Sequence, residues 1–310
     1  MADNAHQPVL LAAVLAGLQI KKEGIYVDGT FGRGGHASAV LTQLGPGGRL
    51  LAMDKDPEAV RVAHRKFAGD DRFAIEQGSY ALLRRVLADR GWLGRVDGVL
   101  LDLGVSSPQL DSPERGFSFL ADGPLDMRMD PSVGPSAADW LRTAPESEIA
   151  WIIKRYGEDR YARRIARAIV AERLVRPIET TRRLADLIAA AVPSREPGKH
   201  PATRSFQAIR IHINNELGAL ESALDAALGC LRAGGRLCVI SFHSLEDRMV
   251  KRFMRRHARE DEAWRGLPDV PAHARPKLRL LGRAVRPSQE EVRRNPRARS
   301  ATLRAAERLH

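Results

Sequence analysis

The sequence predicts an α/β protein with a mostly parallel sheet that is interrupted by an all-helical insertion. Three observations predict this fold. Short apolar runs alternate with helix-like segments over the first hundred residues. About 100 residues with only loop and helix signals follow, and another apolar run then resumes the first pattern. Nearly continuous apolar strands, alternating with helices, indicate a parallel sheet that is buried on both faces.

The strands of the sheet are expected in a regular order. Four apolar runs precede the insertion and one follows it; they span residues 25–27, 49–53, 73–76, 98–101 and 237–240. Helices are expected between them and after the insertion, at residues 36–44, 57–67, 82–90, 206–231 and 244–259. Two weaker strand signals close the chain, at residues 278–285 and 301–305.

The insertion begins with a long loop, because residues 111–135 contain seven glycines and prolines. Ser136 and Thr180 can cap the first and the last of four helices, and isoleucines recur at helical spacing between them. A basic, turn-rich linker is expected at 197–205. We expect one domain at 1–108 and 212–310, and the inserted domain at 109–211.

The positive charge of the chain is concentrated near its end. The 310 residues carry a net charge of +12, and residues 248–310 hold 18 Lys and Arg against 7 Asp and Glu. This asymmetry favours an anionic partner, with nucleic acid first. The alternative is a solvated face that happens to be rich in arginine.

Other compositional features exclude several classes of protein. The two cysteines form neither a disulfide framework nor a zinc-like cluster, so no metal site is expected. The first residues lack the features of a signal peptide, and no apolar run approaches the ~18 residues that span a bilayer. A cytoplasmic protein without a membrane partner is therefore expected.

A glycine-rich turn after the first strand is typical of a nucleotide-binding site. Gly34 and Gly35 lie where a helix begins, and Asp54 ends the next strand, where it can bind ribose hydroxyls. The turn also fits a loose dinucleotide fingerprint, so a nicotinamide or flavin oxidoreductase stays open. Asp28 favours S-adenosylmethionine, because a carboxylate there can meet an amino group but would repel a pyrophosphate.

The end of the fourth strand carries a second group of polar residues. Asp102 can contact the adenine or the methionine part of a cofactor, and Gln109 is a further polar partner. Ser106 and Ser107, stiffened by Pro108, can accept hydrogen bonds from an exocyclic amine beside a methyl donor. The alternative is an ordinary Ser-Pro turn.

Aromatic residues offer candidate contacts for a nucleic-acid base. Phe242 can stack on a base, and His243 can shuttle a proton, although packing and helix capping are the commoner roles. Phe117 and Phe119 lie in the Gly/Pro-rich loop, where exposed rings can hold an extruded base.

Seven segments together resemble one family. They are residues 6–11, 28–36, 102–109, 115–119, 125–130, 241–248 and 295–300. They are similar, in order, to signature segments of the bacterial small-subunit ribosomal RNA (cytosine-N4)-methyltransferases, called RsmH or MraW. The resemblance covers essentially the whole chain.

The resemblance implies a class I S-adenosylmethionine-dependent methyltransferase core with a Rossmann-like, mostly parallel seven-stranded sheet and an inserted helical domain that recognises the substrate. It implies S-adenosylmethionine as methyl donor and, as acceptor, the N4 amine of a decoding-centre cytidine in the 16S RNA of the small ribosomal subunit. A homodimer is compatible with it.

The family's site residues carry over by motif. The cofactor contacts are expected to be Gly34, Gly35, His36, Asp54, Tyr80, Asp102 and Gln109. The catalytic set is expected to be Asp102, Ser106, Ser107, Pro108 and Phe242. The segment before Tyr80 departs from the family's usual Asn-Phe, although an aromatic ring for the adenine is kept.

Two other functions compete with methylation. One is the dinucleotide oxidoreductase, and the other is a non-enzymatic RNA-binding or assembly factor that uses the basic tail. In the methylation hypothesis, RNA backbone is expected to contact Arg293, Arg294, Arg297 and Arg299 of the tail.

Overall fold

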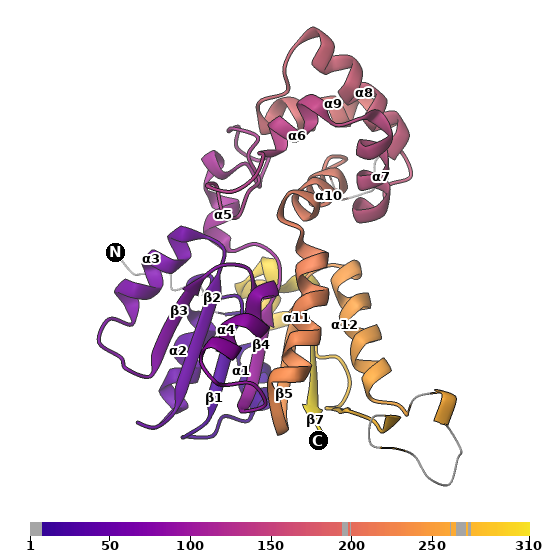
Figure 1. Cartoon of the computed structure of the whole chain (residues 1–310). Coiled ribbons are helices and arrows are strands. Elements are labelled where there is room, and N and C mark those ends of the chain that lie inside the picture. Colours follow the sequence, from indigo (N-terminus) through magenta and orange to yellow (C-terminus); the bar gives the residue numbers. More distant parts are fainter. Residues whose placement is uncertain (1–7, 194–197, 199, 261, 265–270, 272–273) are drawn as a thin grey trace. The chain divides into compact units, whose positions relative to one another are not determined.

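The computed structural model describes residues 8–193, 198, 200–260, 262–264, 271 and 274–310. The chain divides into two compact units, Met1–Gly104 with Gly218–His310 and Val105–Leu217 (Figure 1). The insertion expected at 109–211 falls within the second unit. In the described part of the chain, no helix is both long enough and apolar enough to cross a membrane.

The first unit contains a seven-stranded sheet with the order β3-β2-β1-β4-β5-β7-β6. The strands from β3 to β5 are parallel, and β7 runs antiparallel to both β5 and β6. The predicted fold class is therefore confirmed. The strands are β1 (Ile25–Asp28), β2 (Arg49–Asp54), β3 (Phe73–Gln77), β4 (Val96–Asp102), β5 (Leu231–Ser241), β6 (Leu278–Leu280) and β7 (Thr302–Arg308).

The sheet is buried on both faces, as its apolar strands predict. Leu50 and Leu51 are neighbours on β2, yet they belong to different apolar clusters, and so do Leu100 and Leu101 on β4. Successive strand residues point to opposite faces, so each cluster covers one face. The helices of this unit are α1 (Leu11–Leu18), α2 (Gly35–Gln43), α3 (Pro57–Lys66), α4 (Leu83–Asp89), most of α11 (Glu216–Cys230), α12 (Ser244–His257) and α13 (Gln289–Arg294).

The structure corrects three expectations about these elements. The helix expected at 206–231 is two helices, α10 (Thr203–Asn214) and α11, because Asn215 adopts a left-handed conformation with φ 48°. Asparagine tolerates this conformation better than most residues. The linker expected at 197–205 ends earlier, where α10 begins. The strand expected at 237–240 is longer, because β5 begins at Leu231 and its register with β4 shifts between Val96 and Gly98.

The second unit is helical and has its own core. Its helices are α5 (Ser107–Asp111), α6 (Ala137–Thr143), α7 (Glu146–Gly157), α8 (Ala162–Val175), α9 (Thr181–Ala191) and α10. Ile149, Ile165 and Ile188 are fully buried in one cluster. Ser136 Oγ accepts a hydrogen bond from Asp139 N at 3.1 Å, and Thr180 Oγ1 accepts one from Arg183 N at 3.3 Å. Both predicted caps are thus confirmed.

Hydrogen bonds and packed aromatic side chains hold the predicted long loop in place. Asn214 accepts a hydrogen bond from Met129 N and donates one to Met127 O, each at 2.7 Å. Phe117 is only 7% exposed, and the ring of Phe119 packs 4.7 Å from that of Phe206. The expectation of an exposed ring is therefore wrong for Phe117, whereas Phe119 is partly buried against the core of this unit.

Candidate cofactor site

Three carboxylates end neighbouring strands of the sheet. Asp28 ends β1, Asp54 ends β2 and Asp102 ends β4. Because β1 lies between β2 and β4 and all three strands are parallel, their carboxyl ends meet at one edge. The strand order changes direction between β1 and β4, and open α/β sheets bind ligands at such a switch point. We refer to this edge as the site edge.

The glycine-rich loop lies against this edge. Gly29 N donates to Leu100 O and Phe31 N donates to Met53 O, each at 2.9 Å. Gly34 has φ +70°, and a Cβ there would lie 2.5 Å from the Phe31 ring. A Cβ on Gly35 would lie 2.5 Å from Pro8. Close packing, besides any approach of a ligand, therefore requires the two predicted glycines. The preceding His6 and Gln7 of the first signature segment lie outside the described residues.

Asp54 joins the glycine loop to the end of β2. Its two carboxylate oxygens accept hydrogen bonds from Gly32 N at 2.7 Å and from Asp56 N at 2.9 Å. Burial nevertheless raises the pKa of Asp54 to about 6. Each oxygen has a further lone pair, so the group can still accept a hydrogen bond from a ribose hydroxyl.

Asp28 is almost fully buried, with 2% of its surface exposed. Its Oδ1 accepts hydrogen bonds from Thr30 N at 3.1 Å and Thr30 Oγ1 at 3.4 Å. Burial raises the pKa of Asp28 to about 7, and the charge of Asp54 acts in the same direction. Asp102 N in turn donates to Thr30 Oγ1 at 2.6 Å. Thr30 therefore links the ends of β1 and β4.

Asp102 has a buried carboxylate oxygen that accepts no hydrogen bond from any residue that the structure describes. The side chain is 24% exposed, and its Oδ1 is the buried, unpaired atom. Burial raises the pKa of Asp102 well above its usual range, and the charges of Asp28 and Glu246 add to this effect. Leaving such a group unpaired costs free energy, so the site fits a ligand that brings a positive charge or a donor.

His36 lies beside Asp102 but does not neutralise it. Its Nε2 is 3.0 Å from Val9 O, so this nitrogen is assigned the proton, and Nδ1 lies 3.6 Å from Asp102 Oδ2. Burial lowers the pKa of His36 to about 4, so the ring is neutral at physiological pH. Among the described residues, no Lys or Arg forms an ion pair with Asp28, Asp54 or Asp102.

Tyr80 lies next to the glycine loop. It begins a short 3-10 helix, Tyr80–Leu82, that follows β3. A Cβ on Gly29 would lie 3.3 Å from the Cβ of Tyr80, so the two segments are in close contact. Gly34, Gly35, His36, Asp54, Tyr80 and Asp102 therefore all belong to segments at the site edge.

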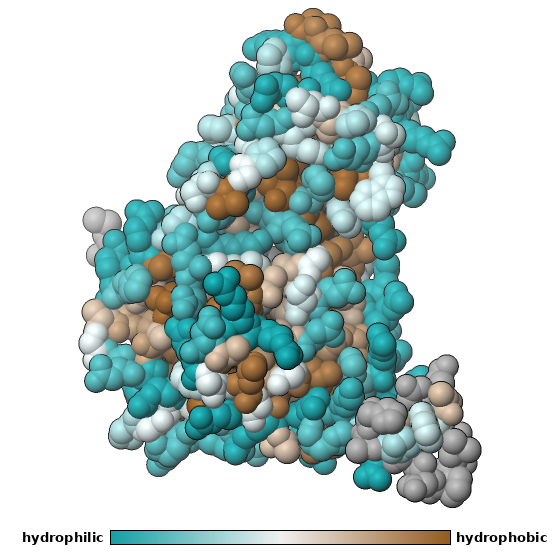
Figure 2. All heavy atoms as spheres, in the orientation of Figure 1, coloured by the Kyte–Doolittle hydropathy of each residue, from teal (hydrophilic) through white to brown (hydrophobic). Residues whose placement is uncertain are grey.

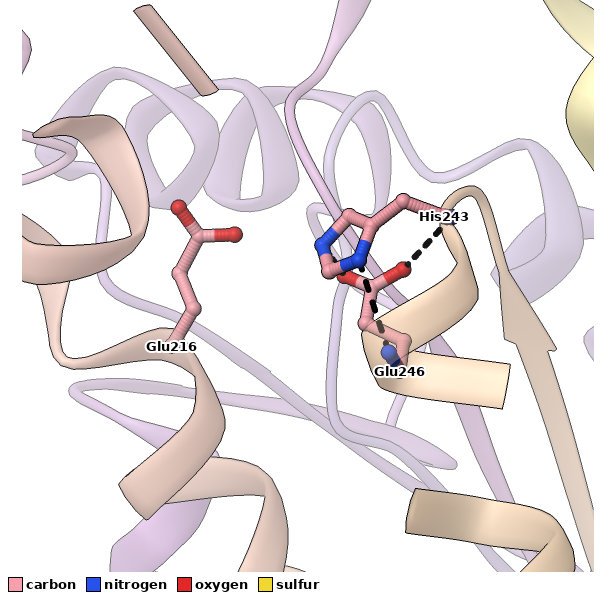
Figure 3. Close-up of side chains that lie close together, drawn as sticks. All are labelled: Glu216, His243 and Glu246. Atoms are coloured by element: carbon pink, nitrogen blue, oxygen red, sulfur yellow. Dashed lines mark hydrogen bonds and ion pairs between the residues drawn. The ribbon is translucent and has the colours of Figure 1, made fainter. Parts of the chain in front are cut away.

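The end of β5 reaches the same edge and leads into α12. His243 caps this helix, because its Nδ1 accepts a hydrogen bond from Glu246 N at 3.4 Å (Figure 3). Glu246 is 2% exposed and accepts a hydrogen bond from Phe242 N at 2.8 Å. The capping alternative for His243 is confirmed. Sequence analysis missed Glu246 and Thr30, although an Asp-Gly-Thr turn is a known signal for the second.

The remaining predicted residues lie in the helical unit. Ser106 precedes α5, and Ser106 N donates to Gln109 Oε1 at 2.9 Å, as in a capping box. Gln109 is buried. Ser107 and Pro108 form the first turn of α5, so this segment starts a helix.

The basic tail is divided between the two ends of the sheet. Residues 293–299 lead into β7, whose first residue, Thr302, pairs with Ser241 at the end of β5. Because β7 is antiparallel to β5, this segment lies at the site edge. Lys277 adjoins the start of β6, where Leu278 pairs with Arg308, at the opposite edge. Arg293, Arg294, Arg297 and Arg299 are all exposed.

The chain is similar in sequence to known methylases. Residues 3–309 match the model of the MraW methylase family. A ribosomal RNA small subunit methyltransferase H of Thioalkalivibrio sulfidiphilus is 60% identical over 98% of both chains. One of Xanthomonas campestris is 59% identical over 98% of this chain and 88% of its own length.

Solved structures are more distant. An rRNA methylase of Streptococcus thermophilus aligns over 99% of both chains at 11% identity, with a TM-score of 0.44. A similarity this low does not bear on function. The match to the family model and the identities near 60% do, and the chain therefore belongs to the MraW methylase family.

Proposed function

We propose that this protein methylates the N4 amine of a decoding-centre cytidine in 16S ribosomal RNA. Relatives near 60% identity are named ribosomal RNA small subunit methyltransferase H, which supports the RNA and the subunit. The choice of cytidine and of its N4 atom rests on the seven signature segments. The reaction takes place in the cytoplasm, where small subunits are assembled.

Membership of a methylase family decides between the competing classes. It excludes the dinucleotide oxidoreductase and disfavours a purely structural RNA-binding factor. S-adenosylmethionine is the cofactor. When bound, it supplies an electrophilic methyl group on a positively charged sulfur.

The observation that carries the proposal is the unpaired carboxylate oxygen of Asp102. It lies at the switch point of the sheet, beside the buried carboxylate of Asp28. S-adenosylmethionine has two cationic groups, an ammonium and a sulfonium, and either offsets the cost of buried negative charge. Asp28 and Asp102 would hold these cationic parts, and Asp54 would hold the ribose.

The chain must also activate a weak nucleophile. The lone pair of the cytosine amine is delocalised into the ring, and acceptors on its N–H groups favour the reactive, pyramidal form. We assign this role to Ser106 and Ser107 in the turn stiffened by Pro108, and we assign stacking of the base to Phe242. Gln109 is assigned to the cofactor through its amide.

Correct positioning of the two reactants contributes more to methyl transfer than a dedicated base does. Bound S-adenosylmethionine would supply the methyl group and leave as S-adenosylhomocysteine, and the amine would release its proton to water while Ser106 and Ser107 hold its N–H groups. Holding the two reactants in line supplies most of the acceleration. The helical unit is assigned to recognition of the RNA.

The direct test uses purified protein, S-adenosylmethionine with a labelled methyl group and small subunits from a strain that lacks the enzyme. Mass spectrometry of nucleosides from the digested RNA should show labelled N4-methylcytidine. A labelled methyl group on another base or atom, or none at all, would contradict the proposal. Full methylation by an Asp102→Ala variant would contradict the assignment of the site.

A further inference from the structure

The helical unit carries a concentrated basic surface at the turn between α7 and α8. The two helices pack against each other and are joined by only four residues, so the end of α7 lies beside the start of α8. Between residues 151 and 167 there are six Lys and Arg and two acidic residues. One of the acids, Asp159, is 6% exposed and accepts a hydrogen bond from Tyr161 N.

Five of the six basic side chains of this turn are exposed and form no ion pair with an acidic residue in the part of the chain that the structure describes. They are Lys154, Arg155, Arg163, Arg164 and Arg167. Other arginines of the same unit do have partners: Arg128 pairs with Asp126, and Arg210 pairs with Glu216. In Figure 2 the right-hand side of this unit carries many teal side chains, whereas its top is brown.

Lys154 and Arg155 lie in the last turn of α7, where positive charge is favourable, but the same reason does not explain the cations at the start of α8. Arg163 and Arg164 lie in the first turn of α8, which contains no acidic residue. Positive charge at the start of a helix opposes the helix dipole. Arg167 follows Arg164 by three residues and Arg163 by four, so its side chain neighbours both of them on the exposed side of α8.

An exposed tryptophan accompanies the cations. Trp151 is 54% exposed, and Lys154 and Arg155 follow it by three and four residues on the same face of α7. Only 5% of the chain is aromatic, and the other tryptophan of this unit, Trp140, is 8% exposed. An indole flanked by cations offers stacking to a base and charge to its phosphates.

We propose that this surface binds a single-stranded segment of the RNA substrate. We call it the hairpin surface, because α7 and α8 form a helical hairpin. It consists of Trp151, Lys154, Arg155, Arg163, Arg164 and Arg167. Arginines contact successive phosphates, and Trp151 stacks on an unpaired base. The inference rests on the proposed function, because it takes RNA as the substrate, and it adds a binding surface outside the cofactor site.

The test measures binding of a fluorescein-labelled, single-stranded 20-nucleotide RNA over a range of salt concentrations. An Arg163→Gln/Arg167→Gln variant removes two phosphate contacts, so the slope of log affinity against log salt should fall by about 1.4. An Arg84→Gln/Arg95→Gln variant of the other unit makes the same change in charge at exposed positions and should keep the slope. Equal effects of the two variants would overturn the proposal.

Trp151 is tested separately. Trp151→Ala should weaken binding about 5- to 150-fold, which is the range of base–aromatic stacking, whereas Trp151→Phe should keep most of the affinity. Circular dichroism checks that each variant is folded. Binding unchanged in both Trp151→Ala and Arg163→Gln/Arg167→Gln would overturn the inference.

The proposed function is judged by a different measurement. If wild-type protein does not methylate small-subunit RNA, the proposed function fails, whatever the binding results are. If it does methylate this RNA while both hairpin variants bind like wild type, only the hairpin surface fails. The two failures are therefore distinguishable.

Discussion

The two ends of strand β4 carry aspartates with opposite surroundings. Asp97, near its start, is 7% exposed and accepts a hydrogen bond from Ile25 N at 3.0 Å. Its Oδ1, like that of Asp102, accepts no hydrogen bond from a described residue, but it forms ion pairs with Lys21 and Arg232. Asp102, at its end, has a neutral histidine as neighbour and an unpaired buried oxygen. The two residues lie five positions apart on one strand, so the difference does not come from the strand itself.

This contrast separates a structural acid from a functional one. Asp97 joins β4 to the segments around it, and its charge is compensated inside the protein. The charge of Asp102 is not compensated in this way. Asp28 and Asp54, which end neighbouring strands, also have raised pKa values. A protein keeps such a group at a cost in stability, and a cationic ligand then recovers part of that cost on binding.

The largest effect should be a dependence of cofactor affinity on pH. The pKa of Asp28 is about 7 and that of Asp54 about 6 in the free protein, so a cationic ligand that prefers ionised carboxylates must displace protons below these values. Affinity for S-adenosylmethionine should rise up to about 10-fold per pH unit for each proton released, between about pH 5.5 and 7.5. Calorimetry in buffers of different ionisation enthalpy counts the protons.

S-adenosylhomocysteine is the matched control, because it lacks the methyl group and the positive charge of the sulfur. Its affinity should depend less steeply on pH. Asp28 should have the opposite effect on the stability of the free protein. Its contribution to the free energy of unfolding should fall between about pH 4 and 7, because Asp28 ionises at a lower pH in the unfolded chain than in the folded protein. His36, with its lowered pKa, opposes this trend between about pH 4 and 6.5. Identical pH profiles for the two ligands would contradict the account.

A smaller effect is expected at Thr30, which bridges Asp28 and the backbone of Asp102. Thr30→Val keeps the shape but removes the hydroxyl, so it should weaken binding of S-adenosylmethionine about 5- to 10-fold, as loss of roughly 1 kcal/mol of hydrogen bonding implies. Thr30→Ser should restore most of the affinity. A Thr30→Val protein with wild-type affinity would show that the bridge does not matter for the cofactor.

The smallest effect concerns the two ends of the basic tail. Arg297→Gln/Arg299→Gln, at the site edge, should weaken RNA binding and lower the salt slope by about 0.7 per lost phosphate contact. Lys277→Gln/Arg279→Gln changes the same charge at the opposite edge and should leave the slope nearly unchanged. Binding of the cofactor should not change in either variant. Equal salt slopes in the two variants would show that the tail acts only through its total charge.

Much of the fold follows from local sequence signals. Apolar strands such as residues 98–101 and caps such as Ser136 predicted elements that the structure contains, because burial and capping are encoded by short patterns. The break at Asn215 was missed, since the helical pattern continues through it and only one residue changes conformation.

The site was predicted in part. Asp28, Asp54 and Asp102 each end a strand, so the sequence indicated that they share an edge. That none of them forms an ion pair with a described Lys or Arg depends on which cations reach that edge, and this is set by distant segments of the chain. Glu246 and the burial of Phe117 were missed for the same reason, because tertiary packing decides both.

The most direct test compares Asp102→Asn with Asp97→Asn by calorimetry and thermal unfolding. Asp102→Asn should weaken binding of S-adenosylmethionine about 10-fold or more while the free protein stays as stable as wild type or becomes more stable. Asp97→Asn should lower the free energy of unfolding by about 1–3 kcal/mol and leave the affinity of the folded protein unchanged. The opposite pattern, with binding lost at Asp97 and stability lost at Asp102, would contradict the account.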